Sequence, residues 1–242
     1  MRRTGPAALA FAILAAAAPA AADGMPDDFV RLSEAAPTVR QDIRYFGADN
    51  FTGAPVPGYE APQCVLTRPA AAALAKVQTE LADKGYELIV FDCYRPEKAV
   101  AAFMDWSRSD NPGKPYFYPG IEKSAIIPDG YVAERSGHSR GSTVDLGIVR
   151  LDRDTDTFPP RAQRCDESSM SSLGLEMGTD FDCFSPRSAT ATEEVSEDAQ
   201  ANRKVLLDAM TDAGFVNYPK EWWHYTLGNE PYPDRYFDFD VE

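Results

Sequence analysis

Two segments in the first half of the chain have the spacing of apolar residues that is typical of amphipathic helices. Residues 69–84 carry Leu74, Val77 and Leu81 on one helical face, and a proline stands in the first turn, where no N–H is needed. Residues 96–107 repeat this arrangement, again with a proline at the start. Both segments are therefore predicted to be helices with one face in the core.

A third helix is predicted over residues 193–213, which end just before Gly214. Thr190 and Glu193 have the spacing of a capping box near its start. An apolar stripe that includes Leu206 is expected to face the core.

Short segments between and after the helices predict strands. Residues 87–93 form a largely apolar run typical of a buried strand, and residues 142–149 alternate between apolar and polar positions. Residues 215–218 and 221–227 are also strand-like. Because these strands lie close enough along the chain to pair antiparallel, we expect an α+β fold, a single domain with a central antiparallel sheet and flanking helices.

The start of the chain has the three-part pattern of a secretory leader. Arginines at positions 2 and 3 precede an apolar run too short to span a membrane, and small residues before position 23 offer a cleavage site. We expect residues 1–22 to be a signal peptide and residues 23–242 to form a secreted or periplasmic domain without membrane insertion. The alternative is an Ala-rich leader with no targeting role. Residues 23–63 are expected to be irregular structure with short strands, and residues 150–171 to be a surface insertion.

The charge balance excludes several kinds of partner. The 242-residue chain has 24 Lys and Arg against 38 Asp and Glu, which gives a net charge of −14. Duplex nucleic acid and anionic membranes both select a basic face, so neither is an expected partner. No feature of the sequence predicts an oligomeric state. The chain contains two histidines, so any chemistry that needs imidazole depends on His138 and His224.

The four cysteines are compatible with an exported protein. Secretion permits disulfides, and four cysteines allow three pairings, between which the sequence alone does not choose. We favour Cys64 with Cys93 and Cys165 with Cys183, because each pair brackets one local segment. A zinc site made of cysteines is the alternative, but the chain has no CxxC spacing.

The first candidate for chemistry is the pair His138 and Asp145. The two residues can meet if the chain turns at Gly141 and then runs as the strand 142–149. A carboxylate in the middle of an apolar strand is costly to bury without a partner, and a metal ion would satisfy it. A solvent-facing acid on a half-exposed strand is an equally open interpretation of Asp145.

The second candidate is Glu221, which precedes His224 by three residues in the segment EWWHY. In a regular strand their side chains would point to opposite faces, so a bulge or turn is needed to bring them to one site. Burial of His224 in an aromatic core strand, with no role in chemistry, is the alternative.

Taken together, the two segments predict a zinc site. Two imidazoles and one carboxylate form a known zinc ligand set that leaves a position for water. Glu221 then supplies the separate carboxylate that moves protons. Arg95 follows the predicted strand 87–93, where it could stabilise an oxyanion, and a surface salt bridge is the alternative interpretation.

The segments around both histidines also resemble motifs of a known family. Residues 136–145 (SGHSRGSTVD) and 221–224 (EWWH) resemble the SxHxxGxxxD and ExxH motifs of the zinc D-Ala-D-Ala metallopeptidases, and more closely their VanX-type D-alanyl-D-alanine dipeptidase branch. Further segments agree in the same order: residues 49–53 (DNFTG), 58–60 (GYE), 94–96 (YRP), 231–233 (PYP) and 236–239 (YFDF). The resemblance covers about residues 38–240.

The resemblance implies a hedgehog-like fold around one zinc ion per chain. The implied zinc ligands are His138, Asp145 and His224. Glu221 would be the general base, and Arg95 would stabilise the tetrahedral intermediate. Three further residues fall where the family contacts its dipeptide: Tyr45, Ser136 and Asp182. A carboxylate suits the substrate's ammonium group, and a hydroxyl suits its carboxylate.

Together with the leader, the resemblance implies a secreted zinc dipeptidase that hydrolyses D-Ala-D-Ala to two D-alanines. One alternative is a D,D-carboxypeptidase or endopeptidase acting on peptidoglycan stem peptides. Another is a zinc-stabilised module that binds wall peptides without turnover, against which Glu221 counts because a binder needs no base. The export signal favours periplasmic wall fragments over a cytosolic precursor as the source of substrate.

Overall fold

A five-stranded sheet lies at the centre of the molecule, with the strand order β2-β4-β5-β7-β6. The computed structural model describes residues 24–151, 162–167 and 175–242. The strands span β2 (Arg40–Gln41), β4 (Tyr86–Asp92), β5 (Thr143–Arg150), β6 (Phe215–Asn217) and β7 (His224–Leu227). The predicted antiparallel pairing holds from β4 to β6, whereas the edge strand β2 pairs parallel to β4.

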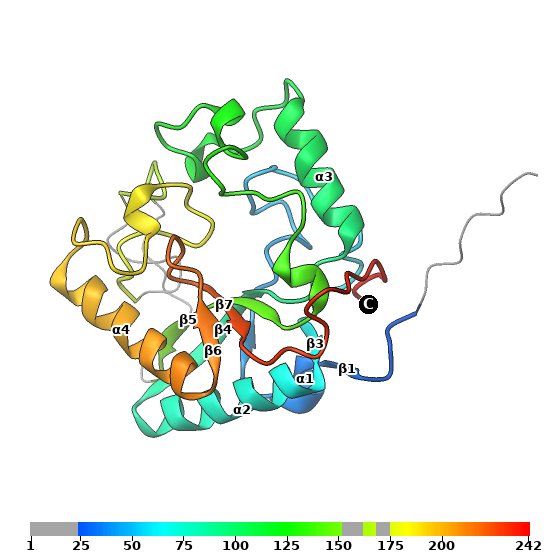
Figure 1. Cartoon of the computed structure of the whole chain (residues 1–242). Coiled ribbons are helices and arrows are strands. Elements are labelled where there is room, and N and C mark those ends of the chain that lie inside the picture. Colours follow the sequence, from blue (N-terminus) through cyan, green and yellow to red (C-terminus); the bar gives the residue numbers. More distant parts are fainter. Residues whose placement is uncertain (1–23, 152–161, 168–174) are drawn as a thin grey trace, which may run out of the picture.

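Three long helices surround this sheet. Helix α2 (Arg68–Asp83) packs on β4, and α4 (Glu197–Asp212) packs on both β6 and α2. Helix α3 (Glu97–Arg108) lies apart from them on the other side of the molecule (Figure 1). The α+β class and the flanking helices are therefore as predicted, and each helix begins or ends within a few residues of its predicted bounds.

The remaining elements are short. Strands β1 (Phe29–Arg31) and β3 (Val65–Thr67) form a separate antiparallel pair, and α1 (Leu32–Ala35) follows β1. The short strands β1 and β2 lie within residues 23–63, where irregular structure with short strands was predicted, whereas the short helix α1 in the same region was not predicted. The 3-10 helices are η1 (Pro115–Phe117), η2 (Lys123–Ala125), η3 (Gly137–Arg140) and η4 (Pro186–Ser188).

The predicted capping box of α4 is wrong. The helix begins after Ser196, whose side chain accepts a hydrogen bond from the Ala199 N–H at 3.1 Å. The Thr190 hydroxyl instead donates to the Asn217 side chain at 2.7 Å. The spacing of a capping box recurs by chance in a polar segment, and the true start is set by where the chain meets the core.

Strand β5 is buried on both faces, apart from its last residue. Asp145 is 2% exposed, so the interpretation of this residue as a solvent-facing acid is wrong. A strand that is paired on both edges and covered on both faces exposes no face to solvent, even when its sequence alternates.

Both favoured disulfides are present in the structure. One joins Cys64, just before β3, to Cys93, just after β4, and the other joins Cys165 to Cys183. The predicted signal peptide and most of the predicted insertion lie outside the described residues. Within the described residues, no helix is both long and apolar enough to cross a membrane.

Candidate metal centre and active site

Two histidines and one aspartate converge beside the central sheet. Asp145 on β5 is directly paired with His224, the first residue of β7, and η3 brings His138 to the same point. The Nε2 atom of His138 lies 3.3 Å from Asp145 Oδ2, and the Nδ1 atom of His224 lies 3.0 Å from Asp145 Oδ1. The two imidazole nitrogens are 3.4 Å apart. The chain thus brings three potential metal ligands within one coordination shell.

A tight turn before β5 makes this convergence possible. The Ser136 hydroxyl caps η3 by accepting a hydrogen bond from the His138 N–H at 3.2 Å. Gly141 then ends η3 in the left-handed region, with φ +80°, and a Cβ at this position would collide with the ring of Phe29. Glycine is therefore required where the chain passes from His138 to Asp145.

The residues fit a divalent metal. Tetrahedral zinc with ligand bonds of about 2.0–2.1 Å separates its ligand atoms by about 3.3 Å, close to the spacing of these three groups. The Oδ1 atom of Asp145 is buried and accepts no hydrogen bond from the described residues. Burial opposes ionisation of Asp145, but its interactions with the His138 and His224 side chains outweigh burial and hold the pKa of this carboxyl below its usual range.

A backbone carbonyl sets the tautomer of His138. Its Nδ1 lies 2.7 Å from the carbonyl oxygen of Cys93, which can only accept, so Nδ1 carries the proton. The unprotonated Nε2 is the nitrogen that lies close to Asp145 and His224, so it is available as a metal ligand.

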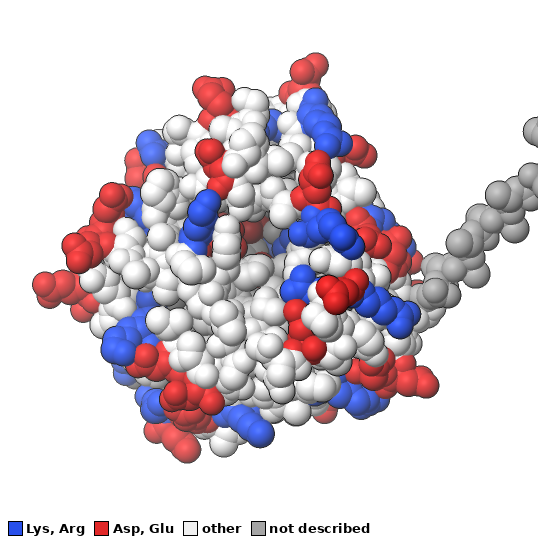
Figure 2. Space-filling view, in the orientation of Figure 1, with Lys and Arg blue, Asp and Glu red and all other residues white. Residues whose placement is uncertain are grey.

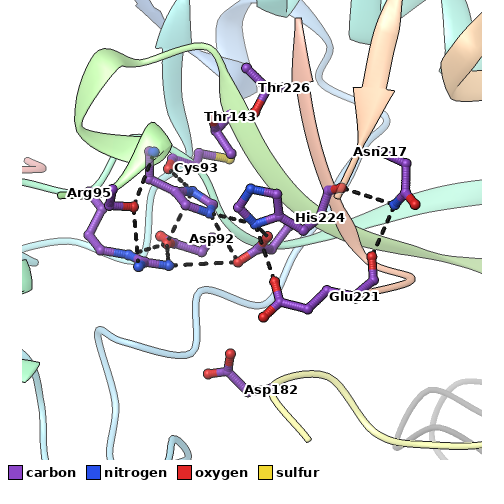
Figure 3. Close-up of polar contacts among 12 residues, drawn as sticks. Asp92, Cys93, Arg95, Thr143, Asp182, Asn217, Glu221, His224 and Thr226 are labelled. Atoms are coloured by element: carbon purple, nitrogen blue, oxygen red, sulfur yellow. Dashed lines mark hydrogen bonds and ion pairs between the residues drawn. The ribbon is translucent and has the colours of Figure 1, made fainter. Parts of the chain in front are cut away.

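Glu221 reaches the same site through a turn. The strand β7 begins at His224, so the alternation of strand side chains does not apply to Glu221. The side-chain amide of Asn217 donates to the carbonyls of Glu221 and His224 at 3.0 and 3.1 Å and fixes the turn between them (Figure 3). The Glu221 carboxylate lies 3.5 Å from His224 Nδ1. Burial raises the pKa of Glu221 well above its usual range, and the charge of Asp145 raises it further.

Arg95 is held on the opposite side of His138 by a buried aspartate. Asp92, the last residue of β4, accepts from Arg95 Nε at 2.9 Å and from the Tyr59 hydroxyl at 2.6 Å. The Arg95 guanidinium also lies 3.7 Å from Asp145 and 3.5 Å from the Ser136 hydroxyl. It is therefore a cation fixed within the site and not a surface salt-bridge residue.

Asp182 lies on a separate loop and faces the site of the candidate metal ligands (Figure 3). Its carboxylate accepts a hydrogen bond from the Tyr45 hydroxyl at 2.7 Å. Burial, and then the charge of Asp145, raise the pKa of Asp182 to about 8. The ring of Tyr45 packs under the guanidinium of Arg95, at 5.1 Å.

These groups line one cavity of about 270 Å³, which includes Ser136, Glu221 and the three candidate ligands. A hollow with acidic atoms inside it is visible near the centre of the face in Figure 2. The volume suits a small ligand. The described structure thus brings all eight predicted site residues to one cavity: Tyr45, Arg95, Ser136, His138, Asp145, Asp182, Glu221 and His224.

The chain matches the sequence model of the D-Ala-D-Ala dipeptidase family, peptidase family M15, over residues 25–157 and 160–242. The chain belongs to this family. Curated relatives carry the same name, D-alanyl-D-alanine dipeptidase. The protein of Enterococcus faecalis is 39% identical over 219 residues, which cover 90% of this chain and all of the relative. A relative from Streptomyces coelicolor is 39% identical with the same coverage, and one from Escherichia coli is 30% identical over 200 residues, 83% of this chain and 84% of the relative.

Membership of this metallopeptidase family agrees with the His-Asp-His cluster. Two further residues, Asp92 and Asn217, hold Arg95 and Glu221 and were not predicted from the sequence. An acid at the end of a buried strand was a usable signal for Asp92. Nothing in the sequence around Asn217 indicates its two carbonyl partners.

Proposed function

We propose that the protein is a zinc-dependent dipeptidase that hydrolyses D-Ala-D-Ala to two D-alanines. The observation that carries the proposal is that Glu221 and Arg95 flank the His138, Asp145 and His224 cluster inside a small cavity. The names of the curated relatives support the choice of substrate.

Bound zinc would act as a Lewis acid that activates water and polarises the scissile carbonyl. Glu221 takes a proton from the attacking water at a carboxylate oxygen and passes it to the leaving amine, which balances the two proton transfers of amide hydrolysis. Arg95, already fixed by Asp92, stabilises the negative charge that develops on the carbonyl oxygen.

Two groups in the cavity suit the ends of a free dipeptide. The positive charge of the substrate's ammonium favours the ionised form of Asp182, which accepts hydrogen bonds from it, and the Tyr45 hydroxyl holds the Asp182 carboxylate in place. The Ser136 hydroxyl donates to the substrate's carboxylate. A site that reads both charged ends rejects longer peptides, because their amides would leave buried polar groups unpaired.

Release of D-alanine from D-Ala-D-Ala tests the proposal. We expect turnover with zinc, loss of turnover after chelation and recovery when zinc is restored, with little cleavage of a stem pentapeptide. Activity that survives complete removal of the metal contradicts the mechanism. Comparable cleavage of the pentapeptide favours a carboxypeptidase or endopeptidase.

We also propose that the chain is exported to the periplasm, on the basis of the leader pattern in residues 1–22. Amino-terminal sequencing of the protein from its source cells should find a mature chain that begins at or near Asp23 in the periplasmic fraction. A chain with an intact leader in the cytosolic fraction contradicts this proposal.

A further inference from the structure

We propose that the two disulfides position the two sides of the active site separately. The Cys64–Cys93 bond holds the metal ligand His138, and the Cys165–Cys183 bond holds Asp182 at the substrate end of the cavity. The first half of the proposal, on Cys64–Cys93, concerns metal binding. The second half, on Cys165–Cys183, concerns substrate binding and rests on the proposed function.

The first disulfide is attached to the carbonyl that orients His138. Cys93 accepts the Nδ1 proton of His138 on its backbone oxygen at 2.7 Å, and its sulfur is bonded to Cys64. Both cysteines are buried. The neighbouring Tyr94 N–H donates to the Val65 carbonyl at 2.9 Å, so covalent and hydrogen bonds together fix the end of β4 against the start of β3. A shift of Cys93 would therefore move the acceptor that sets the angle of the imidazole.

The same short segment carries the oxyanion-stabilising group. Cys93 stands between Asp92 and Tyr94, and Arg95 follows two residues later. The Arg95 N–H donates to the carbonyl of His138 at 3.4 Å, in addition to the ion pair with Asp92. The disulfide thus fixes a stretch of backbone that contacts His138 from two directions.

The second disulfide is attached next to Asp182. Asp182 has φ +60° and is the only non-glycine residue of the described chain with a positive φ. A positive φ is uncommon for residues other than glycine, although aspartate tolerates it better than most, so contacts that hold the backbone on either side help to keep Asp182 in this conformation. Its neighbour Cys183 is bonded to Cys165, whose N–H donates to the Tyr116 carbonyl at 3.1 Å. On the far side, the Phe184 N–H donates to the Phe117 carbonyl at 2.7 Å.

These contacts tie the Asp182 loop to η1 at two adjacent positions, one of them through the disulfide. None of these contacts reaches His138 or His224. Loss of this bond should therefore disturb substrate binding and leave the metal ligands in place, whereas loss of the first should disturb the metal.

The test compares two double variants, each the control for the other: Cys64→Ala with Cys93→Ala, and Cys165→Ala with Cys183→Ala. Zinc affinity is measured by competition with a chromogenic chelator, and kcat and KM are measured with D-Ala-D-Ala on the folded protein. Thermal melting, recorded in parallel, reports global stability.

For the first variant we expect the zinc dissociation constant to rise about 10- to 100-fold, the usual effect of losing the support of a ligating histidine. For the second we expect unchanged zinc affinity and a KM about tenfold higher, which corresponds to Asp182 occupying its observed conformation about a tenth of the time. Lower melting temperatures with unchanged zinc affinity and unchanged KM assign both bonds to stability alone and overturn the proposal.

A second form of the first variant, Cys64→Val with Cys93→Ala, refills the buried space and should show the same weakened zinc binding. If neither form folds even with zinc present, the bond serves global folding, and the positioning role is overturned. If the native chain binds zinc but does not cleave D-Ala-D-Ala, the proposed function fails, whereas the zinc measurement still decides the first half.

Discussion

Asp145 is a buried acid at the point where the three candidate metal ligands meet. Its carboxylate is buried, faces two imidazoles and has one oxygen without a hydrogen bond from the described residues. A histidine nitrogen that donates a hydrogen bond to the Asp145 carboxylate has no lone pair left to bind a metal. A divalent cation at this point would satisfy all three side chains at once.

Glu221→Gln separates proton transfer from metal binding. The amide keeps the size of the side chain but cannot take a proton, so kcat should fall about 10²–10⁴-fold while zinc stays bound. The measurement is turnover of D-Ala-D-Ala with zinc content by atomic absorption. His224→Ala is the matched comparison and should lose the metal. A Glu221→Gln enzyme with near-native kcat removes Glu221 from the mechanism.

Asp92→Ala tests the buried ion pair behind the site. The change leaves the Arg95 charge without its main partner in a buried position, so the free energy of unfolding should fall by about 3–5 kcal/mol. Urea denaturation measures the loss. Asp208→Ala breaks an exposed pair with Lys204 and should cost less than about 1 kcal/mol. Equal effects at the two positions would refute the special role of Asp92.

At the scale of elements, the chemistry depends on how η3, β5 and β7 meet. Register pairs Asp145 with His224 across β5 and β7, and the Gly141 turn returns His138 to the same point. A shift of β7 by one residue would turn His224 to the other face of the sheet. The site is therefore a consequence of strand register and one turn.

Gly141→Ala should be more harmful than the same change at another left-handed glycine. Gly85 has φ +83°, and a Cβ added there would have nothing within 4 Å, whereas a Cβ at Gly141 would meet the Phe29 ring. Gly85→Ala should cost about 1 kcal/mol from backbone strain alone, and Gly141→Ala about 1–3 kcal/mol more from overpacking. Chemical denaturation compares the two. Only Gly141→Ala should also weaken zinc binding, and a similar loss of zinc in both variants would contradict the role assigned to the Gly141 turn.

At the scale of the whole molecule, we expect the core that supports the site to fold without metal. The central sheet, its helices and two disulfides connect the segments that carry the site residues. A fold of this size buries enough apolar surface to stand without a structural ion, unlike a zinc finger.

Metal removal should therefore lower stability without unfolding the protein. Zinc at about 100 times its dissociation constant adds about 2.7 kcal/mol to the free energy of unfolding by mass action. Thermal melting with chelator should show a cooperative transition at lower temperature, and zinc should restore the original midpoint. His224→Ala serves as the control that does not respond to zinc. Complete loss of the transition in chelator would show that the metal is structural.

The sequence by itself determined the local elements and the chemical inventory. Apolar spacing placed the three long helices and β4 and β5, because side-chain periodicity reflects which face is buried. The scarcity of histidine and the adjacent acids identified the candidate ligands and Glu221, since few residue types can perform this chemistry.

Only the tertiary structure decided what depends on contacts between distant segments. It buried Asp145, paired β2 parallel to β4, capped α4 with Ser196 and joined Asp182 to Tyr45 by a hydrogen bond. It also placed Asp92 behind Arg95. Local patterns report how a segment meets its nearest neighbours, whereas burial and long-range hydrogen bonds depend on the packing of the whole chain.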